Sequence, residues 1–225
     1  MTVESATTAT GTRPATGDEL DPLSHTLAAA FRDDPVFGWL LPEERTRQDR
    51  LQRFFTLSLR HMGFARGAVF TCEQRAGAAV CMPPGRWQLP PRVALAQGPA
   101  FWRAFGRRLP IATAFQAKLE LRHERRPHWY VLAVGVRPER QGQGLGSALL
   151  APTLERCDRE GLPAYLEASS ERSAALYERL GFEHVGELRL AGSPPVWKML
   201  RPPKQRGLRS RPWRGATACG SARAA

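Results

Sequence analysis

The feature that most constrains this 225-residue chain is a continuous apolar run followed by closely spaced glycines. Residues His128–Val136 read HWYVLAVGV without helical spacing, which is typical of a strand buried on both faces. A segment with alternating glycines follows, and a helical pattern then extends to Glu160; the three glycines are Gly142, Gly144 and Gly146. This order predicts a central strand, a glycine-rich loop and a helix over Gly142–Glu160 that bends at Pro152.

A glycine-rich loop that opens a helix is suited to a phosphate group. The N–H groups of the first helical turn have no partner within the helix and carry partial positive charge. Glycine has no Cβ to keep an anion away from the backbone. The segment Val134–Ser147, which also contains Arg137 and Arg140, therefore predicts a pyrophosphate site rather than a connector without a ligand.

A dinucleotide site of the Rossmann type is the main alternative for this segment. The order of strand, glycines, helix, strand and then Glu167 fits that type of site. However, Ser147 stands where the fingerprint needs its third glycine. Residues Arg137–Gln141 also separate the strand from the first glycine, whereas a Rossmann turn is tight. Both differences disfavour this alternative.

Two motifs resemble those of the GNAT superfamily of N-acetyltransferases. The first is Gln141-x-x-Gly144-x-Gly146, and the second is LYERLGF at Leu176–Phe182. They occur in the order and at the separation usual in that superfamily. The likeness is clearest over His128–Leu200.

Within the superfamily, the chain most resembles the puromycin N-acetyltransferase-like group. The residues that carry this likeness are Trp129–Ala148, Leu162–Ser169, Trp197 and Met199.

The resemblance implies a GNAT-like α/β (α+β) fold, with a mixed, centrally splayed β-sheet of about seven strands flanked by helices. Strands interleaved with helices along the chain agree with it. Apolar periodicity predicts helices over Asp18–Arg32, Glu43–Met62, a segment around Phe101–Leu109, Ile111–Glu124 and Glu171–Leu180. Further strands are expected at Arg13–Thr16, Gly67–Cys72, Ala76–Met82, Pro163–Glu167, Phe182–Leu188 and Val196–Leu200.

The charge distribution separates a folded body from a basic tail. The net charge of +12 at first suggests a nucleic-acid partner, but residues 201–225 hold seven basic residues and no acid. We therefore expect a disordered N-terminus over 1–12, one domain over 13–201 and a disordered basic tail over 202–225. A nucleic-acid partner is disfavoured, and both a monomer and a homodimer stay open.

Neither a membrane span nor a metal site is expected. No apolar run approaches the length of a membrane helix, and the polar N-terminus lacks the features of a signal peptide, so we expect a cytoplasmic protein. The four cysteines form no CxxC pair and the five histidines no HExxH pair. Cys72 and Cys81 could face each other on a hairpin, although small buried thiols are the favoured interpretation.

The resemblance implies acetyl-CoA as the cosubstrate. The backbone of the central strand would bind the pantetheine arm, through Val134, Gly135 and Val136. The following loop would bind the pyrophosphate, through Arg140, Gln141, Gly142, Gln143, Gly144, Leu145, Gly146 and Ser147. The superfamily often has an asparagine, just before the tyrosine, that touches the cofactor. The nearby positions in this chain are Ser170 and Ser173, and a serine hydroxyl is shorter but still forms hydrogen bonds.

The resemblance also implies direct acetyl transfer to an amine through a tetrahedral intermediate. The Val136 N–H would stabilise the developing oxyanion. Tyr177 stands at the general-acid position, and a phenol with a reference pKa of about 10 is protonated at neutral pH. Glu167 would accept a proton, directly or through water, because its apolar neighbours suggest partial burial. A packing role for Tyr177 and a solvated Glu167 are the alternatives.

We predict a small-molecule primary amine as the acceptor. A protein N-terminus or lysine, and an acyl-CoA-binding protein without enzymatic activity, are the alternatives. Asp33, Asp34 and Trp39 fall in a loop that often borders the acceptor site in GNAT proteins, and acids beside an aromatic ring suit a cationic amine. A helix-stop sequence followed by a core tryptophan explains the same residues equally well. His61 is expected at the surface.

Overall fold

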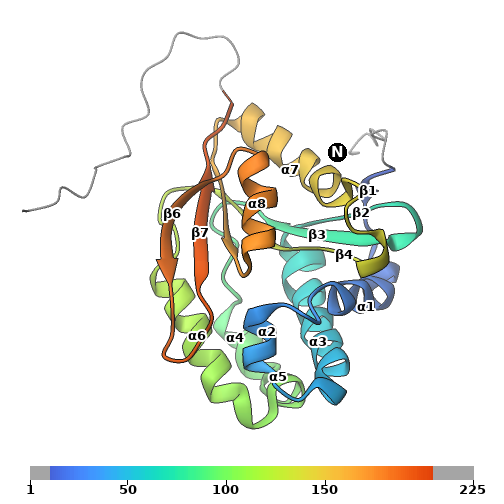
Figure 1. Ribbon diagram of the computed structural model, residues 1–225, viewed down its shortest axis with the longest axis vertical. Coiled ribbons are helices and arrows are strands. Elements are labelled where there is room, and N and C mark those ends of the chain that lie inside the picture. The colour runs from blue at the N-terminus through green and yellow to red at the C-terminus, as the bar shows by residue number, and fades with distance from the viewer. Residues whose placement is uncertain (1–10, 205–225) are drawn as a thin grey trace, which may run out of the picture.

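A computed structural model describes residues 11–204 of the chain as one seven-stranded sheet covered by helices (Figure 1). The spatial order is β1-β2-β3-β4-β5-β7-β6. The strands are β1 (Arg13–Pro14), β2 (Ala68–Thr71), β3 (Gly77–Met82), β4 (Trp129–Val136), β5 (Ala164–Ala168), β6 (Glu183–Leu188) and β7 (Val196–Arg201). The predicted mixed sheet of about seven strands is confirmed.

The central strands β4 and β5 pair only at one end. They are parallel and pair at Trp129 with Ala164 and at Tyr130 with Tyr165. Beyond Tyr130, β4 continues to Val136 without pairing with β5, while its other edge stays paired with β3. The sheet therefore opens between its two central strands, as expected for a splayed sheet.

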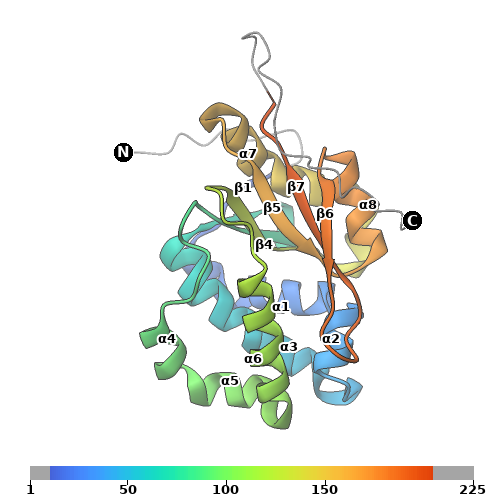
Figure 2. The same ribbon diagram turned by 90° about the vertical axis from the view of Figure 1, so that its left-hand side faces the viewer.

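Helices cover both faces of the sheet (Figures 1 and 2). One face carries α1 (Leu20–Ala30), α2 (Pro35–Leu40), α3 (Glu44–Ser58), α5 (Gly98–Phe105) and α6 (Leu109–Leu121). The other face carries α7 (Leu145–Glu160) and α8 (Glu171–Arg179). Alternation along β3 divides the core accordingly, because Val80 packs with the first set and Cys81 with the second.

The helix α2 lies where the sequence predicted a loop. Asp34 ends the preceding turn but also caps α2, since its Oδ1 accepts hydrogen bonds from the N–H groups of Val36 and Phe37 at 2.9 and 3.0 Å. Pro35 occupies the first helical position, where its missing N–H costs nothing. The same Asp-Asp-Pro sequence thus stops one helix and starts the next.

Other boundaries differ by local geometry. α7 begins at Leu145 rather than Gly142, because Gly142 and Gly144 both have φ of +77°, which no α-helix accommodates. α3 ends at Ser58 and continues as a π-helical turn over Leu59–Phe64. The short helix α4 (Pro91–Ala96) precedes the helix expected around Phe101–Leu109.

The predicted disordered ends fall largely on residues 1–10 and 205–225, outside the described part of the chain. Across residues 11–204, no helix has both the length and the apolar character needed to cross a membrane.

Gly135 sets how closely α1 packs against the open strand β4. A Cβ at this position would lie 2.8 Å from Ala30 Cβ, 3.1 Å from Leu27 Cδ2 and 3.2 Å from Phe31 Cε2. We predict that Gly135→Ala lowers the free energy of unfolding by about 1–3 kcal/mol, measured by urea denaturation, because an overpacked core must shift.

Gly38→Ala is the matched control for this overpacking. No atom lies within 4 Å of a Cβ at Gly38, and the position is helical, so this change should be neutral or stabilising. Equal stabilities of the two variants would contradict the packing account.

Candidate functional site

The open edge of β4 presents two peptide N–H groups to the gap between β4 and β5. Arg137 N–H donates to Ala76 O at 2.8 Å, so residue 137 faces β3. Successive residues of a strand point their peptide groups to opposite edges. Gly135 therefore also faces β3, while Val134 and Val136 face the side where β5 has turned away. Only alternate members of the predicted backbone set thus have N–H groups directed into the gap.

The side chain of Gln141 contacts the end of β4. Its Nε2 donates a hydrogen bond to Val136 O at 2.9 Å. The Val136 N–H takes no part in this contact. The Gln141 side chain therefore ties the loop to the strand.

The loop after β4 is open around its glycines. No atom lies within 4 Å of a Cβ built at Gly142 or Gly144, and both residues are exposed. The helix α7 follows directly, with no side-chain cap on its first N–H groups, which belong to Leu145, Gly146 and Ser147. Arg140 holds Gln143 at the rim, through its Nε and Gln143 Oε1 at 3.0 Å. Uncapped N–H groups beside empty space and an arginine fit an anionic pyrophosphate.

Tyr177 lies on the α7–α8 face of the sheet. Its residue is 7% exposed, and its ring packs on Phe182 with centroids 5.8 Å apart. Burial, together with the charge of Asp34, raises the pKa of the Tyr177 phenol above its usual value. The hydroxyl therefore carries its proton at neutral pH.

Glu167 lies on the opposite face, on the strand β5. Its side chain is 7% exposed, which rules out the solvated alternative. Its Oε1 lies 3.3 Å from His123 Nδ1, within ion-pair distance, and makes no hydrogen bond to a described residue. Tyr130 and Tyr165 lie close by, because burial and then the charge of Glu167 raise the pKa of both phenols. The Tyr165 hydroxyl is buried without a hydrogen-bond partner among the described residues.

The structure thus divides the predicted site between the two faces of the sheet. The glycine loop and Tyr177 belong with α7 and α8, while Glu167 faces the side of α6. The opening between β4 and β5 lies between them.

The other residues of the predicted site form contacts within the fold. Ser173 belongs to the capping box of α8, because its N–H donates to the N-cap hydroxyl of Ser170 at 3.2 Å and its own hydroxyl donates to Ser170 O at 2.8 Å. Asp34 accepts a hydrogen bond from the Ser169 hydroxyl, which links the start of α2 to the end of β5. Trp39 packs on Phe115 with ring centroids 5.7 Å apart. These contacts account for Asp34 and Trp39 through helix capping and core packing.

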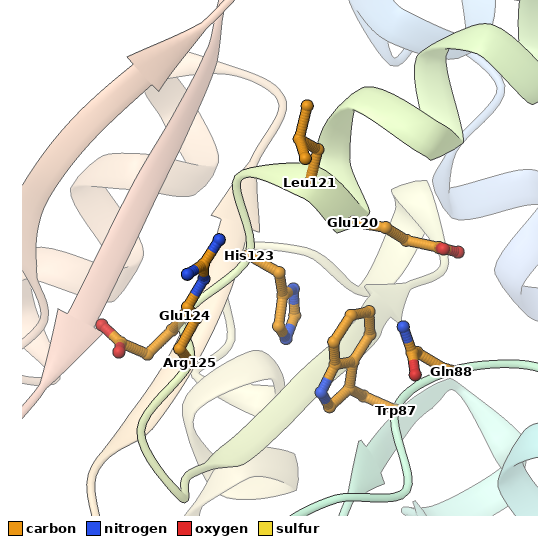
Figure 3. Close-up of a pocket in the computed structure, with 7 residues that line it drawn as sticks. All are labelled: Trp87, Gln88, Glu120, Leu121, His123, Glu124 and Arg125. Carbon is orange, nitrogen blue, oxygen red and sulfur yellow. The ribbon is translucent and has the colours of Figure 1, made fainter.

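Sequence reasoning missed an aromatic and histidine cluster around Glu167, composed of Trp87, His123, His128, Tyr130 and Tyr165. Figure 3 shows Trp87 and His123 side by side in a pocket of about 350 Å³. Tyr165 and Glu167 alternate with Leu166 along β5, so their side chains lie on the same face of the sheet. His123 gives no such signal, because only the chain after α6 brings it to the sheet.

The three described cysteines are buried, free thiols: Cys72, Cys81 and Cys157. The β2–β3 register pairs Cys81 with Ala68, so Cys72 and Cys81 are not cross-strand partners. Burial raises the pKa of Cys81 to about 11 and that of Cys157 to about 12. Within residues 11–204 no group of three or more His, Cys, Asp or Glu side chains is arranged to hold a metal ion.

Comparisons with known proteins agree with this architecture. The model of the acetyltransferase (GNAT) family matches residues 110–182. An uncharacterized N-acetyltransferase of Schizosaccharomyces pombe is 31% identical over 199 residues, covering 80% of this chain and 78% of that protein. A Corynebacterium glutamicum structure, described as histone acetyltransferase HPA2 and related acetyltransferase, is 27% identical with a TM-score of 0.65, covering 88% of this chain and 98% of that one.

A shorter match is to the mycothiol acetyltransferase of Kocuria rhizophila, 50% identical over 56 residues, or 24% of this chain and 18% of that protein. Fold and relatives together define an acyltransferase. The chain belongs to the GNAT family of N-acetyltransferases, whose cosubstrate is acetyl-CoA.

The buried thiols lead to a prediction about their reactivity. We expect Cys72, Cys81 and Cys157 to resist iodoacetamide in the native protein at pH 8 and to react fully in denaturant, measured by peptide mass spectrometry. Each thiol is buried with a raised pKa, so little thiolate is present. Rapid native labelling of Cys81 would contradict this and would allow a covalent acyl-enzyme.

Proposed function

We propose that this protein transfers an acetyl group from acetyl-CoA to a primary amine of a small molecule. The observation that carries the proposal is the gap between β4 and β5, with free strand N–H groups on one side and the buried carboxylate of Glu167 on the other. Likeness to the puromycin N-acetyltransferase-like group stays a prediction of the sequence.

Acetyl-CoA would bind along β4 and the loop after it. The N–H groups of Val134 and Val136 would hydrogen-bond the pantetheine arm, which a strand with a free edge can do without breaking the sheet. The first N–H groups of α7, together with Gly142 and Gly144, would hold the pyrophosphate. Arg140 would add positive charge at the rim, and Ser173 would contribute only through its capped helix.

In the proposed reaction, each protein group has one catalytic role. Acetyl-CoA supplies the activated acetyl group. The Val136 N–H donates toward the oxygen that becomes negative, and its fixed position avoids reorganisation. Glu167 takes the proton that the amine loses, and Tyr177 donates its phenolic proton to the departing thiolate. Direct transfer is favoured because the described thiols are buried and protonated.

Burial supports a small acceptor. Glu167 and Tyr165 are both nearly inaccessible, so the amine must reach an enclosed carboxylate. A slender primary amine meets this requirement more easily than a folded protein surface. A protein N-terminus or lysine, and acyl-CoA binding without transfer, are the alternatives that the next experiment separates.

The direct test is release of coenzyme A thiol by the full-length chain. Acetyl-CoA is offered with a panel of small primary amines, with peptides carrying free N-termini or lysines, and with no acceptor. We expect thiol release and an acetylated product, identified by mass spectrometry, with at least one small amine. Acetylation of peptides only, or cofactor binding with no release for any acceptor, would overturn the proposal.

A glycine pair at the two ends of α7 tests the phosphate site. Gly144→Leu should weaken acetyl-CoA binding, measured by calorimetry, by about tenfold or more, because its side chain fills the space beside the first N–H groups. Gly161→Leu is the matched control, since Gly161 also has positive φ (+66°) and open surroundings but caps the other end of α7. Equal affinities for the two variants would contradict this assignment.

A further inference from the structure

A buried chain of contacts extends from Glu167 away from the gap. Glu167 Oε1 lies 3.3 Å from His123 Nδ1. The Nε2 atoms of His123 and His128 lie 3.0 Å apart, and His128 Nδ1 lies 2.6 Å from the carbonyl oxygen of Arg126. The two histidine residues are 8% and 3% exposed, respectively. Each nitrogen of both rings therefore has a defined neighbour.

The carbonyl at the far end fixes the proton positions in this chain. A carbonyl oxygen only accepts hydrogen bonds, so His128 Nδ1 carries a proton and donates it to Arg126 O. Burial lowers the pKa of His128, which keeps that ring neutral at pH 7 and leaves its Nε2 bare. His123 Nε2 must then carry a proton and donate it to His128 Nε2. The reverse arrangement would set a bare nitrogen against the carbonyl oxygen at 2.6 Å.

One proton is left for the contact between His123 and Glu167. With its Nε2 protonated, His123 presents Nδ1 to Glu167 Oε1, and both atoms are bases. Without a proton between them, two lone pairs would face each other inside the protein. A proton shared between the two atoms removes this repulsion, and the pair is then neutral overall.

The surroundings hold the His123 ring in this orientation. Trp87 stacks on it with ring centroids 3.7 Å apart and an interplanar angle of 22°. Figure 3 shows the two rings side by side. Tyr130 and Tyr165 meet it edge-on, each with centroids 4.8 Å apart. Rotation of the ring would break contacts on several sides at once.

Titratable groups surround the pair on several sides. Raised pKa values keep the phenols of Tyr130 and Tyr165 protonated. Arg126 lowers the pKa of Glu124 to about 2, so that carboxylate stays ionised. The strand β7 places Lys198 opposite Glu167 in register, and its Nζ contacts Arg122 O. Glu120 is the remaining carboxylate nearby, and its charge contributes to the raised pKa of Tyr130.

We infer that His123 is a positioning residue for Glu167, and that the two side chains accept the acceptor's proton as a unit. The inference rests on the proposed function. As a Glu167 oxygen takes the proton of the amine, the shared proton is held on His123 Nδ1. The pair then has two protons and one positive charge, on an imidazolium whose Nε2–H donates to His128. The amine loses one proton, the pair gains one, and no other reactant is needed.

A direct test locates the protons without any acceptor. Full-length protein labelled with ¹⁵N-histidine is studied by imidazole NMR, with His123→Gln and His128→Gln for assignment. We expect a neutral His128 with its proton on Nδ1, and a His123 that carries a proton on Nε2. Glu167→Gln should shift the His123 Nδ1 resonance because the shared proton is lost, whereas His184 should not respond. A proton on Nε2 of a neutral His128, or an unchanged His123 resonance in Glu167→Gln, would overturn the inference.

Kinetics test the consequence for catalysis with the best amine of the panel. We expect His123→Gln to lower kcat about tenfold or more, within the range that a general base supplies, and to leave the KM for acetyl-CoA nearly unchanged. The acidic limb of the pH–rate profile should move, because the proton of the amine is then taken by Glu167 alone and not by the pair. An unchanged profile would overturn the inference, since a purely structural role lowers kcat without moving the limb.

His184→Gln is the matched control, because His184 also contacts a glutamate. Its Nε2 lies 2.8 Å from Glu178 Oε1, but both side chains are about half exposed and lie outside the site. Its kinetics and pH profile should equal those of the unmodified protein. If no amine supports release of coenzyme A, the proposed function fails while the NMR result still decides the proton positions.

Discussion

The structure depends on two parallel strands that pair at one end and then separate. The N–H groups of a fully paired strand are hydrogen-bonded to the neighbouring strands, whereas one edge of β4 is unpaired beyond Tyr130. The fold tolerates this because β3 holds the other edge and because α1 packs directly on Gly135. Gln141 then fixes the end of the strand by bonding Val136 O. The free donors are thus built into a rigid support.

The same separation connects the two faces of the sheet. The glycine loop after β4 and Tyr177 are supported by α7 and α8, whereas Glu167 is supported by a buried aromatic and histidine cluster on the other face. Neither face alone holds all the groups that the proposed acetyl transfer uses. In the proposed reaction, a thioester bound at one face would meet the proton acceptor of the other face in the gap.

Local sequence signals predicted the parts of the site that depend on neighbouring residues. The apolar run before the glycines predicted β4, the open loop and α7, because strand burial, left-handed glycines and helix initiation are all short-range properties. Asp34-Pro35 was interpreted only as the end of a helix. The same residues also start α2, because Asp34 caps its N-terminus and Pro35 occupies its first position. His123 was missed because it is far in sequence from Glu167 and only the folding of the chain after α6 onto the sheet joins them.

Amide hydrogen exchange at β4 tests the central claim most directly. The rates at Val134, Gly135 and Val136 are measured by NMR in the free protein and with saturating acetyl-CoA. We expect Val134 and Val136 to exchange rapidly in the free protein and to slow markedly with acetyl-CoA, while Gly135, bonded to β3, stays slow throughout. Equal protection of all three amides in the free protein, unchanged by acetyl-CoA, would contradict it.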